Sequence, residues 1–77
     1  MDDALHEYVP PKLLTVPEFA AAMRVSQVSV YRWITSQKVA SLKIGGVTRI
    51  PQFELEPMDW ERREKLREEW HEWLKNV

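Results

Sequence analysis

The stretch LTVPEFAAAMRVSQVSVYRWI, residues 14–34, predicts two short helices, and the first begins with a capping signal. Thr15 can accept a hydrogen bond from the helix N-terminus, and Glu18 follows three residues later, as a capping box requires. Pro17 is tolerated in the first turn. Apolar residues then recur at helical spacing as far as Met23, where we expect the helix to end. This stripe consists of Val16, Phe19, Ala20 and Met23.

The second helix of this stretch begins at Ser26 and has its own apolar face. Only Arg24 and Val25 separate Ser26 from the first helix, a connection that favours two helices crossing at a steep angle. We interpret both apolar faces as core packing, not as ligand contacts. The face of the second helix consists of Val30, Trp33 and Ile34.

Residues 40–50 predict a β-hairpin that turns at two glycines. A two-residue loop would place Arg49 on the apolar face of the hairpin. We therefore predict a three-residue loop at 45–47, which pairs Lys43 with Arg49 on the other face. Like charges opposite each other are destabilising, so this placement favours an anionic partner above them. The apolar face then consists of Leu42, Ile44, Thr48 and Ile50.

A last helix is predicted to begin at Glu56-Pro57-Met58-Asp59, with Pro57 in its first turn. Its predicted apolar stripe consists of Trp60, Leu66, Trp70, Trp73, Leu74 and Val77. The opposite, solvated face consists of Glu61, Arg62, Lys65, Glu68, Glu69 and Glu72.

These elements predict a mostly α-helical fold with a small β-hairpin: a winged helix-turn-helix followed by a C-terminal helix. Residues 1–12, which include two adjacent prolines, are predicted to form a flexible or extended arm. Residues 13–56 form the domain, ending in an extended connector at 51–56. Residues 57–77 form an amphipathic helix packed on the same domain.

Composition excludes several function classes. The 77 residues contain no cysteine and two histidines, so we expect no disulfide, metal site or cofactor. We find no phosphate loop or nucleophile motif, and the C-terminal acids have surface spacing, so we expect no enzyme. No apolar run is long enough to span a membrane. Asp2 and Asp3 stand where a secretory signal would have bases, so we expect no export. Met1 at the start and the absence of cysteine lead us to expect a complete small protein in the cytoplasm.

Charge is unevenly distributed along the chain. The net charge is −1. Residues 19–53 contain five bases and no acid, giving +5. Residues 1–18 contain four acids and one base, and residues 54–77 eight acids and five bases, so each flank carries −3. A basic centre between acidic ends favours an anionic partner such as double-stranded DNA.

The exposed face of the second helix has the residue types that contact bases in a major groove. Arg and Gln side chains bond base edges there, and an aliphatic group meets the thymine methyl. For Arg32 the alternative is a solvated or salt-bridged side chain, and for Tyr31 packing against the hairpin or first helix. Arg24 and Lys38 are expected to contact phosphates. Such contacts position the protein on the DNA but do not distinguish one base sequence from another. The predicted groove residues are Gln27, Val28, Tyr31, Arg32, Thr35 and Ser36, and Lys43 and Arg49 would reach the backbone or minor groove.

Residues 13–51 resemble the excisionase and MerR-like winged helix-turn-helix domains. Two positions depart from that pattern. Arg24 stands where glycine is common in the turn between the helices, and Gln37 or Lys38 stands where glycine is common before the wing, so we expect altered turn geometry. The resemblance covers about half of the chain. It rests on Leu14-Thr15-Val16-Pro17-Glu18-Phe19-Ala20, Val25-Ser26, Val30-Tyr31-Arg32-Trp33-Ile34, Lys43-Ile44-Gly45-Gly46 and Arg49-Ile50-Pro51.

The resemblance implies a phage recombination directionality factor, which acts in the cytoplasm of the bacterial host. Such a protein binds short sites in attachment DNA, often direct repeats, bends the DNA and contacts an integrase to favour prophage excision. We also expect a protein that is monomeric alone and self-associates on adjacent DNA sites, acidic end to basic face.

Two alternatives remain open from the sequence. One is a small transcriptional regulator, although the last helix lacks the sustained heptads of a coiled-coil dimer. The other is a protein-interaction adaptor that uses the Trp-rich C-terminal helix. The same tryptophans can instead complete the small core of the protein.

Overall fold

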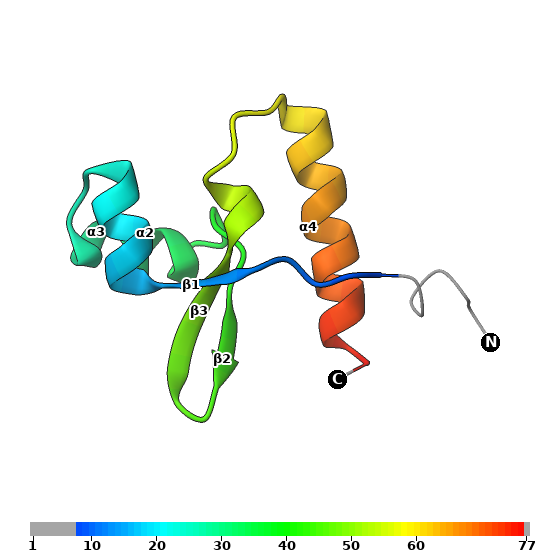
Figure 1. The fold of residues 1–77 in the computed structure, drawn as a ribbon, viewed down its shortest axis with the longest axis horizontal. Coiled ribbons are helices and arrows are strands. Elements are labelled where there is room, and N and C mark those ends of the chain that lie inside the picture. Colours follow the sequence, from blue (N-terminus) through cyan, green and yellow to red (C-terminus); the bar gives the residue numbers. More distant parts are fainter. Residues whose placement is uncertain (1–7, 77) are drawn as a thin grey trace.

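The computed structural model describes residues 8–76, and it confirms the predicted helix-turn-helix with a wing and a C-terminal helix (Figure 1). A third strand, which was not predicted, precedes the first helix. The elements are β1 (Leu13–Thr15), α2 (Val16–Met23), α3 (Gln27–Thr35), β2 (Leu42–Ile44), β3 (Val47–Pro51), the 3-10 helix η1 (Gln52–Glu54) and α4 (Trp60–Leu74). No helix among residues 8–76 is long and apolar enough to cross a membrane.

Both helices of the helix-turn-helix begin at the predicted caps. The Thr15 N–H donates to Glu18 Oε1 over 2.8 Å, and the Glu18 N–H donates to Thr15 Oγ1 over 3.1 Å. At α3 the Ser29 N–H donates to Ser26 Oγ over 3.1 Å. Each cap satisfies backbone donors that have no partner within the helix, and so determines where the helix starts.

The sheet lies between two hydrophobic clusters. The strand order is β1-β3-β2, with both pairs antiparallel. Leu14 and Ile50 are opposite each other and pack with the cluster of α2 and α3. Leu13 and Leu42 point to the other face and pack with the cluster of α4. The first cluster consists of Val16, Phe19, Ala20, Val30 and Ile50, and the second of Ala40, Phe53 and Trp70.

The predicted hairpin register is wrong by one residue. Leu42 pairs with Arg49, Lys43 with Thr48 and Ile44 with Val47, around a two-residue loop. Both loop glycines have positive φ, 54° at Gly45 and 83° at Gly46, as a tight hairpin turn requires. The prediction assumed a single apolar face. Because β1 makes β3 a central strand, apolar residues are needed on both faces, and Ile50 need not pair with Leu42.

The last helix starts later than predicted. Asp59 caps it, since its Oδ1 accepts a hydrogen bond from the Arg62 N–H over 2.8 Å, and the helix begins at Trp60 instead of Pro57. The connector predicted to be extended contains η1. Along α4, Leu66, Trp73 and Leu74 pack around buried Trp70 as predicted, and Val77 lies outside the described residues.

Trp60 was wrongly assigned to the buried stripe, because its side chain is 68% exposed. It lies at the first position of α4 and lines an open groove with Arg67 and His71. The six residues of the predicted solvated face are all exposed.

Of the predicted arm, residues 8–12 carry no helix or strand, and the centroid of the Tyr8 ring lies 6.0 Å from that of the Trp73 ring. Residues 1–7 of the arm lie outside the described residues.

Candidate nucleic-acid interface

The solvent-facing side of α3 brings together five of the six predicted groove residues. Val28, Tyr31, Arg32, Thr35 and Ser36 line one shallow surface. Gln27, the sixth, is exposed at the N-terminal end of the same helix. The core direction of α3 is set by Val30, which is fully buried. This arrangement leaves a mixed polar and apolar face open along the whole helix.

Two exposed side chains on this surface are apolar or aromatic. Val28 is 61% exposed and Tyr31 is 49% exposed, and neither belongs to a hydrophobic cluster. The structure therefore does not pack Tyr31 into the core. Within residues 8–76 Arg32 has no salt-bridge partner, so its guanidinium is solvated. Such a surface has donors for base edges and apolar groups for a thymine methyl.

The two positions where glycine was expected both adopt the left-handed conformation that glycine favours. Arg24, the C-cap of α2, has φ 60° and ψ 45°, and Gln37 has φ 64°. Both residues thus adopt a conformation in which glycine carries no steric penalty, and altered turn geometry relative to the family stays a prediction. Hydrogen bonds hold both turns: the Val25 N–H donates to the Ala20 carbonyl over 3.0 Å, and the Lys38 N–H donates to the Trp33 carbonyl over 2.8 Å.

The predicted basic residues around α3 are placed unequally. Arg24, Lys38 and Lys43 are exposed, whereas Arg49 is partly buried. Lys43 and Arg49 lie on opposite faces of the hairpin, so the prediction that they share a face is wrong. The reason is the two-residue loop, which shifts Arg49 by one position against β2.

Arg49 lies near the N-terminus of α2 and its capping glutamate. Hydrogen bonds from the Thr15 backbone and hydroxyl lower the pKa of Glu18, and the charges of Lys12 and Arg49 lower it further. The guanidinium of Arg49 also donates weakly to the Thr48 carbonyl over 3.4 Å. Arg49 therefore has Glu18 as a charged neighbour, and no ion pair joins the two side chains among residues 8–76.

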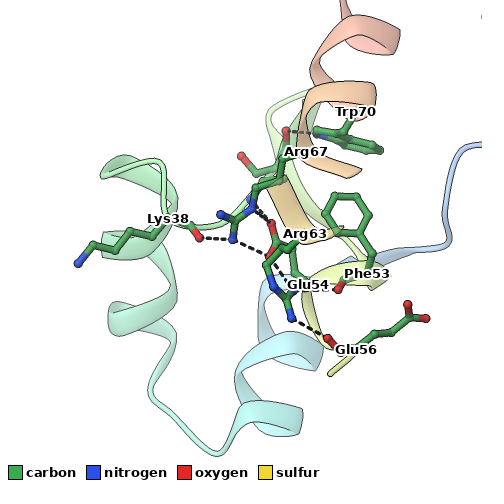
Figure 2. Close-up of polar contacts among 9 residues, drawn as sticks. Lys38, Phe53, Glu54, Glu56, Arg63, Arg67 and Trp70 are labelled. Carbon is green, nitrogen blue, oxygen red and sulfur yellow. Dashed lines mark hydrogen bonds and ion pairs between the residues drawn. The ribbon is translucent and has the colours of Figure 1, made fainter. Parts of the chain in front are cut away.

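A buried ionic cluster, which the sequence analysis missed, connects α4 to the rest of the domain (Figure 2). The Glu54 side chain is only 2% exposed. Its carboxylate accepts two hydrogen bonds from Arg67, over 2.8 and 2.9 Å, and one from Arg63 over 3.3 Å. It also accepts the Ala40 N–H over 2.7 Å. The Glu54 hydrogen bond raises the pKa of the Arg67 guanidinium.

A signal for this cluster was present in the sequence. Arg63 and Arg67 fall at the same helical spacing as Trp70 and Leu74, on the side of α4 that faces the core. Two cations on a buried stripe need a buried anion, because an unpaired buried charge is costly. Glu54 follows buried Phe53 and supplies that anion.

Acidic and basic side chains are distributed unequally between α4 and the helix pair α2 and α3. The helices α2 and α3 lie at one end and α4 at the other, along a principal extent of 42 Å (Figure 1). The basic residues Arg24 and Arg32 belong to the first end. The outer face of α4 exposes the acids Glu61, Glu68, Glu69 and Glu72 together with the bases Arg62 and Lys65.

Comparison with known proteins gives two matches. Residues 13–57 match a family model described as a helix-turn-helix domain. Over 43 residues the chain is 46% identical to an excisionase of Streptomyces ambofaciens, in an alignment that covers 56% of this chain and 69% of that protein. No solved structure matches the chain.

Proposed function

Because the chain belongs to the excisionase family of helix-turn-helix DNA-binding proteins, we propose that it binds and bends attachment-site DNA and directs an integrase toward prophage excision. The observation that carries this proposal is the exposed face of α3, where five predicted groove residues line one surface. A recognition helix of this motif enters the major groove and contacts base edges.

In this proposal different side chains of α3 contact different groups of the DNA. Arg32, at the centre of the face, donates to a guanine edge, and Gln27 contacts a base from the N-terminal end of the helix. Val28 meets a thymine methyl group. Tyr31, Thr35 and Ser36 line the rim of the contact, and Arg24 and Lys38 bond phosphates on either side.

The wing contacts DNA beside α3. Lys43 and Arg49 lie on opposite faces of the hairpin, so a single row of phosphates cannot engage both. A hairpin entering a minor groove edge-on instead presents one face to each strand. We therefore assign Lys43 and Arg49 to the two backbones that border the groove, with Lys43 as the stronger contact because it is more exposed.

Copies on adjacent sites are proposed to touch head to tail. The helix α4 and the pair α2 and α3 lie on opposite sides of the sheet (Figure 1). A contact between the exposed acids of α4 in one copy and the bases of α2 and α3 in the next copy can therefore repeat along DNA. Surface charge pairs contribute roughly 0–1 kcal/mol each, so the contact is weak in free solution. Adjacent sites raise the effective concentration, and bending then accumulates copy by copy.

Probes carrying one, two and three sites test this self-association. We expect affinity per copy to rise with the number of sites, and sedimentation to show a monomer without DNA. Independent binding at every site contradicts head-to-tail contact. A stable dimer in free solution favours a transcriptional regulator instead.

In vitro recombination tests the function itself. Integrase of the same genetic element is incubated with the two attachment sites that border the integrated prophage. We expect excised product with wild-type protein and little with Arg32→Ala. Lys12→Ala removes an exposed base that lies outside α3, the wing and the outer face of α4, and serves as the matched control, which should match wild type. Equal excision by integrase alone contradicts the proposed role.

A second candidate function, contact with a protein partner, is favoured by Trp60. Trp70 and Trp73 belong to the cluster of α4, whereas Trp60 is exposed at the start of the helix. We assign Trp60 to a contact with the integrase. Trp60→Ala should then lower excision while leaving DNA affinity unchanged, and unchanged excision removes this candidate.

A further inference from the structure

The linker between the recognition helix and the wing is held by α4. Residues 36–41 connect the end of α3 to the start of β2. The carbonyl of Lys38 accepts a hydrogen bond from Arg67 Nη2 over 2.6 Å, and the Ala40 N–H donates to Glu54 Oε2 over 2.7 Å. The Ser41 carbonyl accepts from Trp70 Nε1 over 3.2 Å. Three of the six linker residues are therefore bonded to α4 or to the buried Glu54 carboxylate of η1. Figure 2 shows the bond between Lys38 and Arg67.

The first half of the same linker is bonded to α3. The Gln37 N–H donates to the Ile34 carbonyl over 3.1 Å, and the Lys38 N–H donates to the Trp33 carbonyl over 2.8 Å. Lys38 thus bonds α3 through its N–H and α4 through its carbonyl. Lys38 therefore connects α4 to the segment through which the chain passes from the recognition helix to the wing.

We propose that Arg67 and Glu54 are positioning residues for DNA binding, which hold the wing at the angle to α3 that lets both contact DNA at once. The proposal rests on the DNA binding proposed above. Neither side chain needs to touch DNA, since both are largely buried. If the linker is released from α4, α3 can still bind in the major groove, but the wing can move away from the neighbouring DNA backbone.

Arg63 provides a matched control on the same helix. It pairs with the same carboxylate, over 3.3 Å, and is buried to a similar degree. Its other hydrogen bonds go to the carbonyls of Phe53, over 3.0 Å, and Glu56, over 2.6 Å, and none goes to the linker. Replacing Arg63 therefore weakens the ionic cluster without releasing Lys38.

The test combines Arg67→Met and Arg63→Met with a wing variant, Lys43→Ala. In wild type, Lys43→Ala should flatten the dependence of log affinity on log salt by about one phosphate contact. The same flattening is expected in Arg63→Met. In Arg67→Met we expect about tenfold weaker specific binding, and Lys43→Ala should then have no further effect on the salt slope. A purely structural role for Arg67 would leave the Lys43→Ala effect intact.

Hydrogen exchange of the protein without DNA distinguishes the positioning role of Arg67 from the proposed DNA binding. Amide hydrogen exchange at Ala40 and in β2 should be at least about tenfold faster in Arg67→Met than in Arg63→Met, after correction for global stability. If Arg67→Met does not fold, Arg67→Lys replaces it, because one ammonium group cannot bond the carboxylate twice and also reach Lys38. Equal exchange in the two variants, or an undiminished Lys43→Ala effect, overturns the positioning role. Absence of specific binding by wild type contradicts the proposed function. The hydrogen-exchange comparison then tests by itself whether Arg67 holds the linker.

Discussion

Trp60 and Trp70 lie on the same helix, yet Trp70 is fully buried against Phe53 while Trp60 is 68% exposed. The ring centroids of Trp70 and Phe53 are 6.4 Å apart in an edge-to-face arrangement. The indole Nε1 of Trp70 also donates to the Ser41 carbonyl. Trp70 therefore joins α4 to both η1 and the linker, whereas Trp60 contributes little to the core.

We predict that Trp70→Ala lowers the free energy of unfolding by about 3–5 kcal/mol, because it leaves a large cavity in a small core. Trp60→Ala, the matched variant on the same helix, should change it by less than about 0.5 kcal/mol. Urea unfolding followed by circular dichroism measures both. Similar losses from the two variants would contradict the structure.

Replacing Gln37 with glycine should stabilise the protein. Gln37 has φ 64°, a left-handed conformation that costs a non-glycine residue roughly 1–2 kcal/mol. Part of this gain is lost to the entropy of glycine in the unfolded chain, so we expect a net increase of about 0.5–1 kcal/mol. Ser36→Gly is the control, because Ser36 has φ −86° and glycine there should destabilise. Thermal unfolding compares the two, and a loss of stability in Gln37→Gly contradicts the prediction.

The helix cap of α2 should depend on pH. The pKa of Glu18 in the folded protein is lowered from 4.5 by hydrogen bonds from Thr15. A lowered folded pKa means that the charged carboxylate stabilises the fold above pH 4.5, and that this contribution disappears as pH falls through the lower folded value. Wild type should therefore exceed Glu18→Gln in stability at neutral pH, and the difference should shrink below pH 4.5. A pH-independent difference would contradict this assignment.

The helix boundaries of the DNA-binding motif were predictable because their signals are local. Thr15 and Glu18 are three residues apart, as are Ser26 and Ser29, and each pair forms its cap without help from the rest of the chain. The exposed face of α3 was predictable for the same reason. Once Val30 points to the core, helical geometry alone places Arg32 on the other side.

The errors arose where distant segments meet. The hairpin register depended on β1, since Leu14 pairs with Ile50 and gives the sheet two covered faces. The ionic cluster joins Lys38, Glu54 and Arg67, which are far apart in sequence. No periodic pattern within one element contains such contacts, so only the folded arrangement reveals them.

The two wing bases should differ in their effect on DNA binding. Lys43→Ala should flatten the salt slope by about one phosphate contact, and Arg49→Ala by less, because Arg49 is partly buried whereas Lys43 is exposed. Affinities measured across a series of salt concentrations provide the slopes. If neither variant changes the slope, the wing does not contact the backbone; if Arg49→Ala has the larger effect, the assignment of Lys43 as the stronger contact is wrong.

Selection of bound DNA from a random-sequence pool tests most directly whether α3 recognises a specific site. Wild type should enrich one short motif, and Lys12→Ala should enrich the same motif. Arg32→Ala should bind that motif with a loss of about 1–3 kcal/mol and lose base preference at one position. No enriched motif with wild type would contradict the account. Equal weakening of specific and non-specific binding by Arg32→Ala would show that Arg32 contacts only phosphate.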